Sequence, residues 1–314
     1  MLEDKELREI YCESLIDLAE KDERIVLLEA DLMKATGTLP FKQRFPDRTV
    51  DVGVAEANMI GVAAGLSAFG KIPFANSFTA FATRRCYDQI TISVAYAGLN
   101  VKIGGTDPGV AAELNGGTHM SFEDMGIMRN IPGMTIFEPV DGVQLRKILP
   151  QVAAHAGPVY IRLFRRKAEK IFGTSDEFRL GKANRLREGT DATVFATGLM
   201  VANSLEAAKQ LEKEGIGVRV VNMHTIKPLD VEEVVLAAEE TGAVITAENH
   251  SIINGLGSAV AEVLAENRPV PMERVGVRDR FGEVGMKDYL MEALGLTAED
   301  IANAVRKAVR RKNR

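Results

Sequence analysis

The sequence predicts an α/β protein made of two doubly wound domains, the first built on a parallel sheet and the second smaller. Short apolar runs rich in β-branched residues alternate with longer segments of helical period along nearly the whole chain. A polar, glycine-containing stretch at residues 173–187 interrupts this alternation, and a length of 314 residues favours two domains over one. We therefore place the first domain at residues 1–172, a connector at 173–187 and the second domain at 188–314.

In the first domain, six apolar runs have the length of buried strands. They lie at residues 23–30, 49–53, 71–77, 100–105, 134–139 and 159–164, with helices expected between them at 57–69, 79–97 and 141–154, among others. Repeats of strand, helix and strand with right-handed crossovers give a parallel sheet, so the polar residues that follow these strands gather at one edge. The helix at 57–69 is apolar almost all round, and we expect it to be buried between two layers.

The second domain repeats the pattern. Strands are expected at residues 192–198, 218–223, 243–249 and 272–277, and helices at 201–214, 230–240 and 254–265, with two short helices after Met286. The Lys/Arg-rich last residues complement the dipole of a final helix and need no ligand.

Composition and charge narrow the possible partners and location. The chain carries 39 Lys and Arg against 44 Asp and Glu, a net charge of −5, so we expect neither nucleic acid nor a membrane as a partner. The first 20 residues are charged throughout and no long apolar run occurs, which predicts a cytoplasmic protein. Cys12 and Cys86 lie far apart in the sequence and are most simply small buried side chains.

Several common sites are absent from the sequence. It contains no GxGxxG fingerprint, no GxxxxGK[ST] phosphate loop, no HExxH and no GxSxG. Its four histidines lack metal-ligand spacing, so we expect no metal site formed by this chain alone.

Three groups remain that could form a ligand cleft. Glu56 stands where a short strand gives way to the apolar helix; the simpler interpretation is an acidic residue favoured by the helix dipole. Phe78 and Phe81 are three residues apart just beyond another strand end, a spacing more often found in a core. The loop TDPGVAAELNGGTHM is long for a strand-to-helix connection, and loops of this kind are often functional.

Four stretches together resemble the transketolase family of thiamine-diphosphate enzymes. They are VGVAEANMIGVAAGLSAFGKIPFANSFTAF, GGTHMSFEDMGIMRNIPGMTIFEPVD, VVNMHTIKPLD and ENHSIINGLGSAVAEVL. The resemblance is to the C-terminal half of the family, a pyrimidine-binding domain followed by a small C-terminal domain. It implies transfer of a two-carbon ketol unit between sugars, usually sugar phosphates.

The resemblance assigns thiamine diphosphate as the cofactor and gives roles to four residues. Glu56 would hydrogen-bond the aminopyrimidine ring and favour the imino form, whose nitrogen takes the proton from the thiazolium carbon. Phe81 would stack on the pyrimidine, and Phe78 would wall its edge. Asp31 would lie near the thiazolium ring.

Substrate contacts follow from the same resemblance, with two departures. His119 would hydrogen-bond the ketol oxygens, and Arg165 would bind a sugar phosphate. Asn115 stands where an aspartate of the family recognises a sugar hydroxyl, and Asp107 where a histidine commonly assists phosphate binding. Because a carboxylate repels phosphate, we expect a substrate outside the usual pentose-phosphate set, or a phosphate held elsewhere with Arg165 as its anchor.

The family binds its diphosphate and Mg²⁺ through a GDG motif on an N-terminal domain, and this sequence has no GDG. We therefore expect a split enzyme in which a separate N-terminal subunit brings that motif, holds the Mg²⁺ and assembles with this chain into a heterotetramer. Two alternatives stay open: the β subunit of a 2-oxo-acid dehydrogenase, and a non-catalytic partner-binding protein of the same fold.

Overall fold

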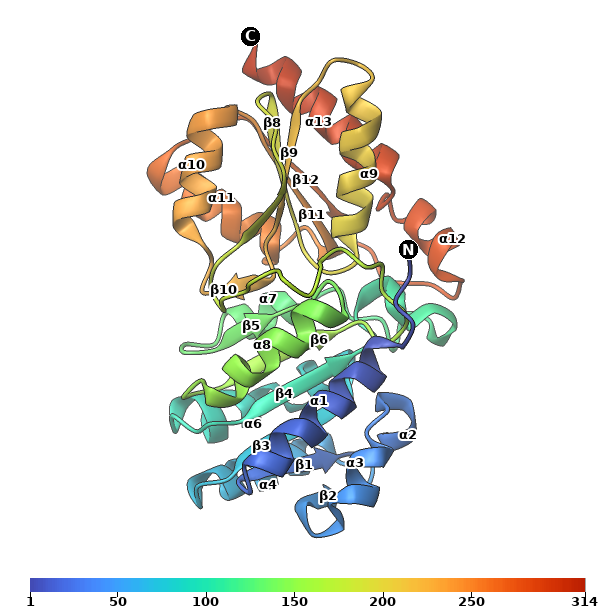
Figure 1. The fold of residues 1–314 in the computed structure, drawn as a ribbon, viewed down its shortest axis with the longest axis vertical. Helices are drawn as coiled ribbons and strands as arrows, with labels where there is room; N and C mark the ends of the chain where they lie inside the picture. The colour runs from blue at the N-terminus through green and yellow to red at the C-terminus, as the bar shows by residue number, and fades with distance from the viewer. Residues whose placement is uncertain (314) are drawn as a thin grey trace.

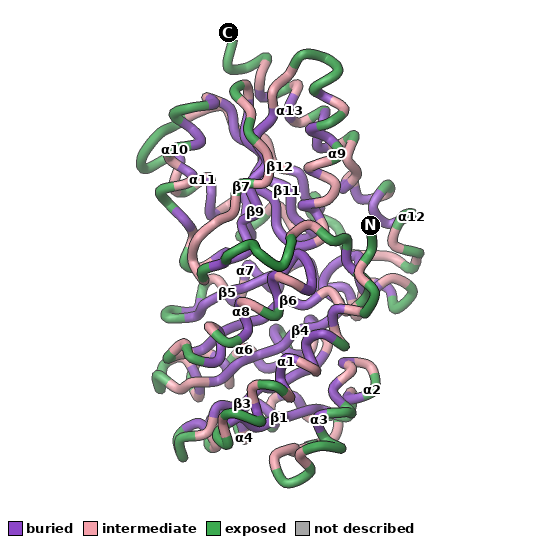
Figure 2. The backbone as a smooth tube through the Cα atoms, in the orientation of Figure 1, coloured by how far each residue is buried: buried purple, intermediate pink, exposed green. Residues whose placement is uncertain are grey.

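Two α/β units follow one another along the long axis of the molecule in the computed structural model, which describes residues 1–313 (Figure 1). Buried backbone is concentrated in the central strands of both units (Figure 2). Among residues 1–313, no helix is long and apolar enough to cross a membrane.

The first unit contains a seven-stranded sheet with the order β10-β5-β6-β4-β3-β1-β2. Its strands are β1 (Ile25–Glu29), β2 (Thr49–Asp51), β3 (Ile72–Phe78), β4 (Lys102–Thr106), β5 (Thr135–Phe137), β6 (Val159–Leu163) and β10 (Thr225–Lys227). Neighbouring strands are parallel except at the edge, where β10 runs antiparallel to β5. The sequence pattern did not predict β10, which the second half of the chain contributes to the first sheet.

Helices cover both faces of this sheet. α1 (Leu7–Lys21) and α8 (Gly142–Ala154) pack on the face to which Ile25 and Leu27 of β1 point, whereas α4 (Glu56–Ala68) packs on the face of Val26 and Leu28. The shorter segments are α2 (Met33–Thr36), α3 (Leu39–Arg44), η1 (Pro46–Arg48), α5 (Thr79–Ala82), η2 (Arg84–Cys86), α6 (Tyr87–Gln89), η3 (Ile90–Tyr96), η4 (Gly109–Asn115) and α7 (Asp124–Arg129).

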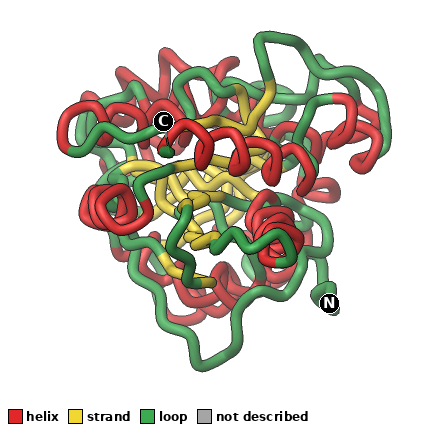
Figure 3. Tube along the Cα trace, turned by 90° about the horizontal axis from the view of Figure 1, so that it is seen from above, coloured by secondary structure: helices red, strands yellow, loops and turns green. Residues whose placement is uncertain are grey.

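The second unit contains a five-stranded sheet with the order β12-β11-β8-β9-β7. Its strands are β7 (Asn184–Arg187), β8 (Ala192–Ala196), β9 (Val218–Asn222), β11 (Val244–Ser251) and β12 (Met272–Val277), and only β7 is antiparallel to its neighbour. Its helices are α9 (Met200–Glu212), α10 (Val231–Thr241), α11 (Leu256–Asn267), α12 (Lys287–Ala293) and α13 (Ala298–Lys312). Viewed from above, helices flank the strands on both sides (Figure 3).

Three expected elements differ in the structure. The single helix at 79–97 is wrong: the backbone leaves the helical region at Thr83 (φ −117°, ψ −83°), and the segment continues as η2, α6 and the π-helix η3. The Thr83 hydroxyl donates to the carbonyl of Thr79 at 2.7 Å, a contact that tends to bend a helix. The last four residues of the expected connector form β7, and the last helix, α13, has 15 residues rather than being short.

The helix α4 is also less enclosed than its composition predicts. Met59, Ile60 and Ala63 are buried, but Gly61 and Gly65 are exposed, and a Cβ added at either would meet no atom within 4 Å. The expectation of burial between two layers is therefore wrong for this chain, because residues 1–313 supply a layer on only one side of α4.

A buried ionic network joins the two units. Arg162 of β6 donates to Asp124 at 2.6 Å, to Glu138 at 2.6 Å and to the carbonyl of Asn249 at 2.7 Å. Tyr160 donates to Asp124 at 2.8 Å, so every charge in this network has a hydrogen-bonding partner.

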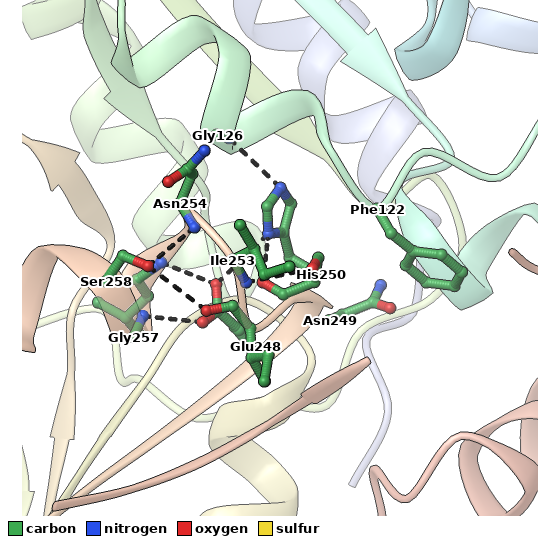
Figure 4. A network of polar contacts seen from close by, with 12 residues as sticks. Phe122, Gly126, Glu248, Asn249, His250, Ile253, Asn254, Gly257 and Ser258 are labelled. Atoms are coloured by element: carbon green, nitrogen blue, oxygen red, sulfur yellow. Dashed lines mark hydrogen bonds and ion pairs between the residues drawn. The ribbon is translucent and has the colours of Figure 1, made fainter. Parts of the chain in front are cut away.

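Figure 4 shows the adjoining part of the junction, on the side of the second unit. His250 Nε2 accepts a hydrogen bond from the Gly126 amide at 3.3 Å across the boundary. Glu248 accepts from the amides of Leu256 and Gly257 at 2.7 and 2.8 Å, at the start of α11. The bond between His250 and Gly126 helps to hold the second unit on the first, while the Glu248 bonds join β11 to α11 within the second unit.

Candidate active site

The carboxyl edge of the first sheet brings three predicted site residues together. Phe78 ends β3, Asp107 follows β4, and Arg165 comes two residues after β6. The parallel register pairs Phe78 with Thr106 and Thr106 with Leu163, so the three strands end side by side. This is the arrangement that the strand-end rule predicts for a ligand site.

Glu56 begins α4 and is only 3% exposed. Both of its carboxylate oxygens accept from Arg85 Nη1, at 2.9 and 3.1 Å. The Arg85 guanidinium also lies over the Phe81 ring, 3.9 Å from its centroid. A planar donor therefore stacks on Phe81 while it is bonded to Glu56, and these are the two contacts that the transketolase resemblance gives to the aminopyrimidine.

Phe78, Phe81 and His119 form an aromatic cluster beside Glu56. The ring centroids of Phe81 and His119 are 5.1 Å apart, those of Phe78 and His119 6.1 Å, and those of Phe78 and Phe81 6.0 Å. The Arg165 guanidinium carbon lies 5.6 Å from the Phe78 centroid, on the border of the same cluster. Contacts thus link Glu56, both phenylalanines, His119, Arg165 and Asp107 in one continuous cluster.

The loop that carries His119 is held by neighbours on both sides. Arg84 donates to the Thr118 carbonyl at 2.9 Å and to Glu123 at 2.8 Å. A Cβ added at Gly117 would lie 2.5 Å from the carbonyl oxygen of Gly282, so only glycine lets these two segments pack so closely. The second unit therefore helps to set the position of His119.

Asp107 and Arg165 are in contact without an aligned hydrogen bond. Arg165 Nε lies 2.8 Å from Asp107 Oδ1, yet neither carboxylate oxygen nor Nε has a hydrogen-bonding partner within residues 1–313. The distance satisfies an ion pair, but the N–H does not point at the oxygen. Burial raises the pKa of Asp107 to about 7, although the neighbouring Arg165 acts to lower it.

Two other predicted residues lie apart from this cluster. Asp31 is exposed and has a positive φ of 61°, and its amide donates to Asp51 at 2.9 Å. Asn115 is exposed, and its Nδ2 donates to the Ala112 carbonyl at 2.9 Å at the end of η4. Among the described residues, no hydrogen bond or ion pair links either of them to the cluster, so their predicted roles stay predictions.

Sequence reasoning missed two residues of this region. Arg85 follows Phe81 by four residues, a spacing that brings side chains together on a helix and could have drawn attention to it. Asn249 is buried and holds the loop after Asp107, because its Oδ1 accepts from the Val110 amide at 3.0 Å and its Nδ2 donates to the Pro108 carbonyl at 2.9 Å. No local sequence signal marks Asn249, since its partners are far away along the chain.

Comparison with known proteins places both units in one family. Residues 3–170 match the family "Transketolase, pyrimidine binding domain", and residues 181–301 match "Transketolase, C-terminal domain". The chain is 62% identical to the 6-deoxy-6-sulfo-D-fructose transketolase subunit SqwH of Clostridium sp. (strain MSTE9), over 99% of this chain and 97% of that one. It is 43% identical to a putative transketolase C-terminal section of Methanocaldococcus jannaschii, over 96% and 95% of the two chains.

A solved structure gives the same result. It is described as a split gene transketolase in the form of an inactive beta4 tetramer, and it is 47% identical to this chain, with a TM-score of 0.90 over 98% of this chain and 99% of that one. The predicted fold class and the predicted family are confirmed, and thiamine-diphosphate dependence follows from the family. The chain therefore belongs to the transketolase family and is a C-terminal subunit of the split type.

Proposed function

We propose that this subunit supplies the half of a transketolase that binds the cofactor's pyrimidine ring and the sugar. In this proposal the enzyme acts on sugars with a terminal sulfonate. The main support for this substrate class is the 62% identity to a 6-deoxy-6-sulfo-D-fructose transketolase subunit over nearly the full length of both chains. The family resemblance is in line with this proposal, since it puts Asp107 where a histidine commonly assists phosphate binding.

The residues of the site suit the cofactor of the family. The Glu56 carboxylate is buried and faces the place where a planar group stacks on Phe81, a place that Arg85 fills in this chain. When bound, thiamine diphosphate supplies the carbanion chemistry. Glu56 holds the proton shared with the pyrimidine, the two phenylalanine rings orient that ring and exclude water, and His119 hydrogen-bonds the ketol oxygens of the sugar.

The remaining half of the site comes from a partner in this proposal. The partner is an N-terminal transketolase subunit that carries the GDG motif and holds the diphosphate and Mg²⁺. Two copies of each chain form a heterotetramer, which is consistent with a split relative that assembles as a tetramer of one chain type and is described as inactive in that form. We propose that the complex is cytoplasmic.

The test is a donor panel on this chain co-expressed with an N-terminal subunit that carries GDG. The donors are 6-deoxy-6-sulfofructose, xylulose 5-phosphate, fructose 6-phosphate and pyruvate, each with short aldose acceptors. We expect ketol transfer from the sulfosugar. Turnover of pyruvate alone would instead indicate the 2-oxo-acid dehydrogenase alternative, and no turnover of any donor by a complex that binds the cofactor would indicate a non-catalytic role.

Arg85→Ala should strengthen cofactor binding by the complex. Arg85 must release both Glu56 and Phe81 before another planar group can take them, and the ion pair is half exposed, so we expect roughly a three- to tenfold lower dissociation constant. Calorimetry with thiamine diphosphate measures the change. Arg146→Ala is the matched control, since Arg146 is similarly exposed and pairs with Glu13, away from Glu56 and Phe81. Weaker binding by Arg85→Ala would mean that Arg85 assists the cofactor.

A further inference from the structure

The acidic end of the substrate should lie beside Arg165. Arg165 borders Phe78 at the edge of the aromatic cluster and is 15% exposed. None of its side-chain N–H groups donates a hydrogen bond to a residue between 1 and 313, although it touches Asp107. A guanidinium with free donors at the edge of the aromatic cluster suits a sulfonate or a phosphate, both of which accept two parallel hydrogen bonds.

No hydrogen bond within residues 1–313 compensates for the burial of the Asp107 carboxylate. It is 2% exposed, and neither oxygen accepts a hydrogen bond from any described residue. A buried carboxylate without hydrogen bonds destabilises a fold, so its position in contact with the one free guanidinium of the cluster indicates a function there. Its backbone is fixed independently, because its amide donates to the Leu163 carbonyl at 3.2 Å and the next residues are held by Asn249.

We infer that Asp107, in contact with Arg165, sets the net charge of the site for the acidic end of the sugar, so that a singly charged sulfonate binds in preference to a doubly charged phosphate. The inference rests on the function proposed above and names the residue responsible for its substrate class. Arg165 alone would present one full positive charge, and Asp107 offsets part of it. An incoming dianion is repelled by Asp107 about twice as strongly as a monoanion in the same place.

Charge is the main feature that separates the two kinds of substrate. In 6-deoxy-6-sulfofructose, the sulfur lies the same number of bonds from the first carbon as the phosphorus of xylulose 5-phosphate, because a methylene group stands where the ester oxygen would be. Both groups present three oxygens in a similar shape. A sulfonate stays a monoanion at all working pH values, whereas a phosphate ester loses its second proton at about pH 6.

The charge of Asp107 should also make the preference depend on pH. The charged groups that face it are Arg165, Arg166, Arg8 and Glu113, of which the arginines lower its pKa and the glutamate raises it. Since burial holds that pKa near 7, Asp107 is mostly neutral below this pH and ionised above it. Rising pH should therefore weaken binding of the phosphate substrate more than binding of the sulfonate.

The experiment compares kcat/KM for 6-deoxy-6-sulfofructose and xylulose 5-phosphate in the reconstituted complex, with native chain and with Asp107→Asn. Asparagine keeps the size and tolerates the positive φ of 58° at this position. We expect the ratio of kcat/KM for the sulfonate to kcat/KM for the phosphate to fall by roughly tenfold in Asp107→Asn. In the native complex this ratio should rise between about pH 7 and pH 8.5, and in Asp107→Asn that rise should disappear. Asp107→His should lower the ratio further, because an imidazole donates to the anion.

Asp17→Asn is the matched control. It makes the same chemical change at an exposed position of α1, away from Asp107 and Arg165, and should leave the ratio within about twofold. The melting temperature of Asp107→Asn should be unchanged or raised, since a buried charge without hydrogen bonds is lost. Suppose that the native complex uses both donors and the Asp107→Asn complex is folded. An unchanged ratio would then overturn the inference about Asp107 and leave the proposed function standing. A native complex that turns over no sulfosugar would overturn the proposed substrate, and the inference with it.

Discussion

Glu56→Gln should reduce ketol transfer by the reconstituted enzyme by roughly 10²- to 10⁴-fold, the range expected for loss of a positioned proton-transfer group. Glutamine keeps the size of the side chain and can still accept from Arg85, which now bonds both carboxylate oxygens at 2.9 and 3.1 Å. It cannot share a proton with the pyrimidine as a carboxyl group does. The fold should therefore survive while turnover collapses, as measured by initial rates at saturating cofactor.

A matched control separates this role from a helix-dipole effect. Glu232 lies in the first turn of α10, and its side chain is exposed, so Glu232→Gln removes an equivalent charge from a helix start away from the site. It should leave the rate unchanged. Near-normal turnover in Glu56→Gln would mean that Glu56 serves only to begin α4.

Arg162→Met should destabilise the chain by about 3–5 kcal/mol, the usual effect of removing one partner from a buried ionic network. Asp124 and Glu138 would be left without their cation in a region with no exposure to solvent, and Asn249 would lose a bond to its carbonyl. The contact between the two units should loosen as well. Urea unfolding, followed by circular dichroism, measures the loss.

Arg24→Met tests the same chemical change where the ion pair is exposed. Arg24 bonds Asp22 at 2.7 Å, but its side chain is 64% exposed, so the free energy of unfolding should fall far less than in Arg162→Met. Equal effects of the two substitutions would show that burial of the Arg162 network contributes nothing to the stability of the junction.

The parallel strands of both sheets could be predicted, because such strands are buried on both faces and appear in the sequence as short apolar runs. β10 could not, because three residues, Thr225–Lys227, cross from the second half of the chain to pair with β5, and nothing local indicates that pairing. The break at Thr83 was missed for a related reason. The apolar pattern of the sequence continues past Thr83, whereas the helical conformation of the backbone ends there.

The site shows the same division between local and distant information. Phe78, Asp107 and Arg165 stand at the ends of neighbouring strands, so the strand-end rule predicted that they would lie at one edge of the sheet, and the structure places them there. Arg85 was missed although it lies four residues after Phe81, because its importance depends on Glu56, far away along the chain. Asn249 reaches the Asp107 loop from the second unit, a contact that requires the fold to be known.

Calorimetric titration with thiamine diphosphate and Mg²⁺ tests most directly whether this chain supplies one half of a shared cofactor site. The three samples are this chain alone, the GDG-bearing N-terminal subunit alone, and the two together. We expect tight, magnesium-dependent binding only in the mixture, with this chain alone binding at least about 100-fold more weakly, a difference of about 2.7 kcal/mol. Tight, magnesium-dependent binding by this chain alone would contradict the split-site account.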